Sequence, residues 1–245
     1  MLGENHVLVA NLALVSLPMK ERHILLPRWG GIEAGATLSD QFRIMWEPEE
    51  PGSTKKQLVH RCWVDSDKSK DHGCVTRALD HSEGTRSFID DYLAGELDGV
   101  YDEDEFLENL GMFLGVESHH IADLCTPVHV GHTIDHKSLG FPTLSRFHSK
   151  VERDITRLAR TSGVRLPKPK LVRADRKYFW EIARETYQDS FVKLPEIYGE
   201  SAPELLEKMV SRALSTAVQH TADVWHTVLA KSGMTKRKWS MQPLL

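Results

Sequence analysis

The chain has 245 residues, of which 40% are hydrophobic and 27% are charged, and its formal net charge is −4 at pH 7. This composition is typical of a folded globular protein and excludes a disordered chain. The small net charge does not require nucleic acid as a partner, although residues 90–108 are strongly acidic and residues 150–177 are strongly basic.

The first half of the chain predicts helices separated by one irregular region. Residues 7–17 form an apolar run that predicts a buried helix ending near Pro18. Residues 27–57 contain three prolines and several glycines, so we expect irregular structure there, with one helix near residues 39–46. Residues 76–93 have weakly periodic apolar positions that predict a further helix.

The clearest predicted helix covers residues 102–125, where apolar side chains recur at helical spacing until Pro127 ends the pattern. Further helices are predicted over residues 147–160, 177–194 and 202–229, the last with Ser201 as its amino-terminal cap. The sequence shows no alternating strand pattern, no linker and no internal repeat. It therefore predicts an all-α fold, a helical bundle in a single domain over residues 1–245.

The sequence says less about the compartment. No stretch approaches the ~20 apolar residues that cross a bilayer. The apolar run 7–17 lacks the basic region and cleavage site of a signal peptide, so we expect none in the chain as given. The three cysteines, Cys62, Cys74 and Cys125, are odd in number and form no disulfide framework, which leaves one pair or none open.

Thirteen histidines stand out in this composition, and their spacing points to metal binding. His119 and Asp123 are four residues apart, as are His148 and Glu152, so each pair lies on one face of a helix. His129 follows the end of the first of these helices and can return to the same pocket. Imidazole and carboxylate without thiolate suit zinc in an open, hydrolytic site.

These residues also carry a resemblance to a known family. The segment HHIADLCTPVH (119–129) resembles the signature of bacterial zinc-dependent phospholipase C, and FHSKVE (147–152) is similar to the downstream motif of that family. NHVLVANLAL (5–14) resembles its first helix, and LVHRCWVDSD (58–67) resembles the segment with a further histidine ligand. The related fungal single-strand-specific nucleases end the downstream pair with Asp, so Glu152 favours the phospholipase branch.

The resemblance implies an all-α fold of the zinc-dependent phospholipase C and nuclease type, with about three zinc ions per chain. It implies a first site at His60, His119 and Asp123, with Asp40 as the candidate for a further upstream carboxylate. A second site would use His129, His148 and Glu152. A third would use His6 and the shared carboxylate of Asp123. Asp40 and Asp123 are the implied catalytic residues.

The amino terminus bears on the third of these sites. In the family, the amine and carbonyl of an amino-terminal tryptophan complete this site, whereas this chain begins with Met1, five residues ahead of His6. The Met1 amine, a different processing of the chain and a weak third site all remain open.

The expected function is hydrolysis of phosphodiesters. A carboxylate that bridges two cations holds them ~4 Å apart and traps a hydroxide that attacks phosphorus. The expected substrate is a phospholipid head group, with the phospholipid at a membrane surface, or a related phosphate ester. Family members are often secreted.

Two alternatives stay open: a single-strand-specific nuclease, which needs base-stacking aromatic residues, and a metal-stabilised binding protein without catalysis. We predict His120, His132 and His136 to lie on loop surface rather than to support the ligands.

Overall fold

The computed structural model describes residues 3–41, 64–65 and 73–239, with the side chains of residues 39–41 excepted. All regular secondary structure in these ranges is helical, which confirms the predicted all-α fold. In chain order the helices are α1 (Gly3–Ser16), α2 (Met19–Leu25), α3 (Trp29–Gln41), α4 (Cys74–Ala94), α5 (Glu103–Leu124), α6 (Pro127–Val130), α7 (Leu144–Ala159), α8 (Arg176–Asp189), α9 (Leu194–Gly199) and α10 (Pro203–Lys231), with short 3-10 turns η1 (Leu26–Arg28), η4 (Phe191–Lys193) and η5 (Met234–Lys236).

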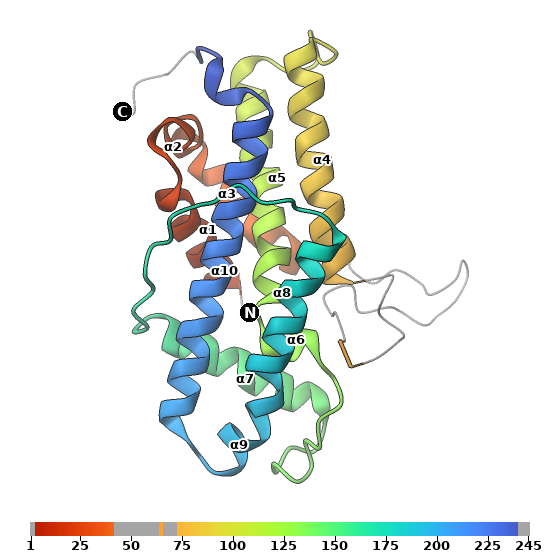
Figure 1. Ribbon diagram of the computed structural model, residues 1–245, viewed down its shortest axis with the longest axis vertical. Helices are drawn as coiled ribbons and strands as arrows, with labels where there is room; N and C mark the ends of the chain where they lie inside the picture. The colour runs from red at the N-terminus through yellow and green to blue at the C-terminus, as the bar shows by residue number, and fades with distance from the viewer. Residues whose placement is uncertain (1–2, 42–63, 66–72, 240–245) are drawn as a thin grey trace, which may run out of the picture.

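Helix α5 lies at the centre of the bundle. It contacts α1, α3, α4, α8 and α10, and Figure 1 shows it running lengthwise between α4 and α10. Its first turn is fixed by a capping box, in which Asp102 accepts from the backbone N–H of Glu105 at 2.8 Å and Glu105 accepts from that of Asp102 at 3.1 Å. Residues 114–124 are all buried. The carboxyl-terminal half of α5 therefore delivers its polar side chains into the interior.

Most predicted helices are confirmed. The predictions over residues 7–17, 76–93, 102–125, 147–160 and 202–229 correspond to α1, α4, α5, α7 and α10, each with somewhat different ends. None of the helices in the described ranges combines the length and the apolar character that crossing a membrane requires.

The predicted cap of α10 is wrong by one residue. The residue before the helix is Ala202, which offers no side-chain acceptor, and α10 begins at Pro203. Proline is well suited to this position because its missing N–H would have had no helical partner. Ser201 instead has a φ of 53°, so it forms the left-handed turn that leads into the helix.

The prediction for residues 27–57 is also wrong in part. Helix α3 covers Trp29–Gln41, much of which was predicted to be irregular, while residues 42–57 lie outside the described ranges. Gly35, one of the glycines that suggested irregular structure, has a packing role. A Cβ atom on Gly35 would lie 2.1 Å from the carbonyl oxygen of Met112, and one on Gly115 would lie 2.2 Å from that of Ile32. The two backbones can approach this closely only because both positions are glycine.

We expect Gly115→Ala to destabilise the fold by a few kcal/mol, because the new methyl group meets backbone that cannot rotate away. Gly84→Ala in α4 is the matched control. A Cβ atom there meets nothing within 4 Å, so alanine is expected to stabilise the helix by about 0.5–1 kcal/mol. Urea unfolding of both variants measures the difference, and equal midpoints would contradict this account of α3–α5 packing.

Candidate metal centre

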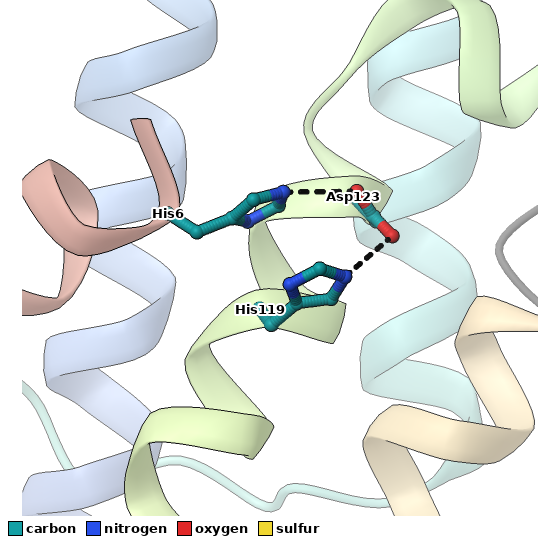
Figure 2. A group of neighbouring side chains, drawn as sticks. All are labelled: His6, His119 and Asp123. Atoms are coloured by element: carbon teal, nitrogen blue, oxygen red, sulfur yellow. Dashed lines mark ion pairs between the residues drawn. The ribbon is translucent and has the colours of Figure 1, made fainter. Parts of the chain in front are cut away.

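Asp123 lies at the middle of a buried group of imidazoles. It comes from the last turn of α5 and is fully buried. Its Oδ1 atom lies 3.6 Å from His6 Nε2 and 3.1 Å from His129 Nδ1, and its Oδ2 atom lies 3.4 Å from His119 Nε2. Figure 2 shows the rings of His6 and His119 on one side of this carboxylate, each directed at a different oxygen. One carboxylate therefore contacts three imidazoles from three helices.

The packing of α3 on α5 orients His119. Its Nδ1 atom lies 3.0 Å from the backbone carbonyl oxygen of Ala36 in α3. A carbonyl can only accept, so Nδ1 carries the proton and Nε2 keeps its lone pair toward Asp123. The His6 ring stacks on His119 with centroids 3.9 Å apart. Burial lowers the pKa of His6 well below its ordinary value, and His119 lowers it further, so His6 is neutral and able to bind a cation.

A second group joins α6 to α7. His129, in the short helix that follows α5, places Nε2 at 3.2 Å from Oε1 of Glu152. His148 lies one turn before Glu152 in α7 and places Nδ1 at 3.3 Å from its Oε2. The rings of His129 and His148 stack with centroids 5.0 Å apart. Because His129 also contacts Asp123, it links the two groups.

The charges in both groups match a cation site. Burial favours the neutral form of Asp123, yet His129 and His119 hold its pKa well below the ordinary value. Glu152 is similar: burial opposes ionisation, but His129 and His148 lower its pKa. Burial also acts to lower the pKa of His129, but Asp123 raises it. Two ionised carboxylates among imidazoles, Asp123 buried and Glu152 partly buried, form an environment in which a cation replaces protons.

A third cluster contains Cys74, which was not among the ligands expected from the sequence. This buried thiol is the first residue of α4, and its Sγ atom lies 4.0 Å from Oδ2 of Asp123. Ligand-type residues lie close in sequence to all three cysteines, Asp71 and His72 in the case of Cys74, so this proximity does not single it out. It reaches the centre through the packing of α4 on α5. No signal within the sequence could have selected it over Cys62 or Cys125.

Donor atoms within 4.8 Å of one another form three overlapping groups in the described ranges. They are His6, His119 and Asp123; Cys74, Asp123 and His129; and His129, His148 and Glu152. Six of the eight ligands expected from the sequence are therefore brought together. Nitrogen and oxygen donors at these separations fit zinc. His6 and His119, expected at different metals, belong to one group around Asp123.

The other two expected ligands cannot be placed. His60 and the side chain of Asp40 lie outside the described residues. The described residues that lie nearest to His60 in the sequence are Val64 and Asp65. Val64 donates its backbone N–H to the carbonyl of Val130 at 2.8 Å, and Asp65 accepts from the backbone N–H of Thr133 at 2.8 Å. This pair thus lies against the segment that follows His129.

Three further histidines, His120, His132 and His136, were predicted to lie on loop surface, and this holds for two of them. His132 and His136 lie in the loop after α6, as expected. His120 does not, because it lies within α5, is 2% exposed and stacks on His81 of α4 with centroids 5.0 Å apart. Glu117, also in α5, is fully buried, and burial raises its pKa to about 8 against the opposing effect of Ser82.

Comparisons with known proteins bear on the fold. No protein-family model matches the chain, and no curated protein does. Among solved structures, the chain is similar to alpha-toxin of Clostridium perfringens, isolated from the avian strain SWCP, with a TM-score of 0.60 and 15% sequence identity over 93% of this chain. The match covers 64% of the alpha-toxin chain, so this chain spans less than two thirds of that length. At this identity the similarity shows the all-α fold and no more.

Proposed function

We propose that the chain is a zinc-dependent phosphodiesterase that hydrolyses phospholipid head groups or related phosphate esters. The observation that carries the proposal is the position of Asp123, a buried carboxylate shared by imidazoles from α1, α5 and α6. A carboxylate with two oxygens aimed at different ligand sets is the arrangement that two-metal phosphoryl-transfer sites require. The resemblance of the central motifs to zinc-dependent phospholipase C, and the similarity in fold to alpha-toxin, support the same function.

The ligand assignment within this proposal follows the motifs. His119 and Asp123 would hold the first zinc together with His60 and Asp40. His129, His148 and Glu152 would hold the second, and His6 with Asp123 would hold the third. Bound zinc would supply Lewis-acid activation of water and charge neutralisation on the phosphate.

The protein itself would contribute orientation and charge. The Ala36 carbonyl fixes the tautomer of His119, so Nε2 stays available at the centre. Asp123 and Glu152 hold negative charge where cations bind. Arg153 and Arg157 are exposed on α7, the helix that carries His148 and Glu152, and such cations would attract an anionic phosphate ester.

The test combines metal analysis with substrate hydrolysis. Protein purified without added zinc and without chelator should contain more than one zinc per chain, and it should hydrolyse phosphatidylcholine vesicles or a chromogenic phosphodiester. Hydrolysis should stop after chelation and return with zinc. One zinc equivalent or none, with no hydrolysis of either substrate, would contradict the proposal.

The same assay separates the alternatives. Cleavage of single-stranded DNA, with phospholipid and the chromogenic ester left intact, would identify a nuclease. A full metal complement without any hydrolysis would identify a metal-stabilised binding protein. Overlapping ligand groups that share Asp123 and His129 argue against the latter, since a structural zinc site is usually one closed set of four ligands.

A further inference from the structure

Cys74 lies among the candidate ligands around Asp123. Gly73, with a φ of 108°, turns the chain directly into α4, so Cys74 is the first helical residue and its side chain enters the interior. The thiol is 0% exposed and lies 4.0 Å from Oδ2 of Asp123. The amino-terminal end of a helix favours negative charge, as a thiolate would carry.

The spacing of the donor atoms matches one coordination shell. The donor atoms of Cys74, Asp123 and His129 all lie within 4.8 Å of one another. Zinc binds sulfur at ~2.3 Å and nitrogen or oxygen at ~2.0–2.1 Å, so two ligands of one tetrahedral zinc lie about 3.5 Å apart. The 4.0 Å between Cys74 Sγ and Asp123 Oδ2 is close to that separation.

A second observation points to a cation at the same place. The Nδ1 atom of His129 is buried and lies 3.1 Å from Oδ1 of Asp123, but it has no hydrogen bond. A buried ring nitrogen close to a carboxylate oxygen without hydrogen-bond geometry suits two ligands that face a shared ion.

We propose that Cys74 is a metal ligand, whose thiolate binds a soft divalent cation together with Asp123 and His129. On binding, the Cys74 thiol loses its proton to solvent and the sulfur forms the bond to the metal. This inference rests on the metal centre of the proposed function, and it adds a sulfur donor to a set expected to contain only nitrogen and oxygen. A thiolate makes the centre selective for zinc or cobalt over magnesium, calcium and manganese.

Cobalt(II) spectroscopy tests the proposal without an activity assay. Protein stripped of metal and reloaded with cobalt should show two features: visible d–d bands, which report bound cobalt, and a near-ultraviolet sulfur-to-cobalt charge-transfer band, which reports a thiolate ligand. We expect Cys74→Ser and Cys74→Ala to lose the charge-transfer band while d–d bands from the other ligand groups remain.

The other cysteines are the matched controls. Cys125 is also buried, but it belongs to none of the three donor groups found in the described ranges. Cys125→Ala and Cys62→Ser should keep the band. Circular dichroism and thermal melting establish that each variant is folded before its spectrum is compared.

The outcomes separate this inference from the proposed function. Wild-type protein with d–d bands but no charge-transfer band overturns the assignment of Cys74 and leaves the metal centre standing. A charge-transfer band that survives in Cys74→Ala and is lost in Cys62→Ser also overturns it. Absence of any bound cobalt, by absorption and by elemental analysis, overturns the metal centre itself.

Discussion

Asp123→Asn is expected to abolish nearly all hydrolysis and to release more than one zinc per chain. Asparagine has nearly the same size as aspartate, but it carries no charge and has one good oxygen donor in place of two. Asp123 contacts His6 and His129 through one oxygen and His119 through the other, so both ligand sets lose their shared member. Substitution of a residue that only orients a metal ligand costs ~10–100-fold in metal affinity or activity. The loss at a shared ligand should exceed that range.

Glu152→Gln provides the comparison. Glu152 contacts His129 and His148 but belongs to a single ligand group, so its substitution should release about one zinc. Asp154→Asn is the control for a buried carboxylate outside the centre. Asp154 is 5% exposed and is held by Lys150 at 2.7 Å and by the Tyr198 hydroxyl at 2.9 Å. Its substitution should lower stability but leave the zinc content unchanged.

Zinc content and kcat/KM are measured for the three variants side by side. Full zinc retention with appreciable turnover in Asp123→Asn would show that Asp123 is not shared between metals. Equal zinc loss in Asp123→Asn and Glu152→Gln would show that the two carboxylates serve equivalent sites. Either result would replace the ligand assignment proposed for the first and third metals.

The placement of the two candidate ligand pairs was predictable because their geometry is local. His119 with Asp123, and His148 with Glu152, lie one helical turn apart, and any helix through those residues places each pair on one face. The strong apolar periodicity of residues 102–125 made that helix clear, and Pro127 marked its end. The all-α class followed from the same periodicities and needed no tertiary information.

Features that depend on tertiary packing could not be predicted in the same way. Glycines at positions 30, 31 and 35 suggested irregular chain, because glycine lowers helix propensity by about 1 kcal/mol. The benefit of Gly35 arises only when it meets Met112 and Gly115 of α5, and that of Gly31 when it meets Glu108, which the sequence of α3 alone does not show. The contact of Ala36 with His119 and the approach of Cys74 to Asp123 follow from the same close helix packing.

Metal removal is expected to lower the melting temperature by about 8–16 °C. The candidate ligands come from α1, α4, α5, α6 and α7, so a bound cation would link helices that are distant in sequence. A ligand that binds only the folded state stabilises it by about 4 kcal/mol at 1,000 times its Kd. For a chain of 150–250 residues, each kcal/mol shifts the melting temperature by about 2–4 °C.

The direction of the shift also follows from the charges left behind. Asp123, which is buried, and Glu152, which is partly buried, stay ionised, and without a cation their described neighbours that can offset this charge are imidazoles. His6 is held neutral by burial and by His119, so it contributes little to that balance. An under-compensated buried charge is costly, and several such groups in one pocket should loosen the contacts of α1 and α7 with the centre.

The measurement is thermal melting by circular dichroism, before and after dialysis against a chelator and again after zinc is restored. Asp154→Asn should show the full chelator-induced shift, because its metal centre is intact. Asp123→Asn should begin from a lower melting temperature and show a much smaller shift, because most of its metal is already lost. If elemental analysis shows that zinc has left the wild-type chain and its melting temperature is unchanged, the cation does not link these helices, and the ligand groups around Asp123 and His129 do not form one metal centre.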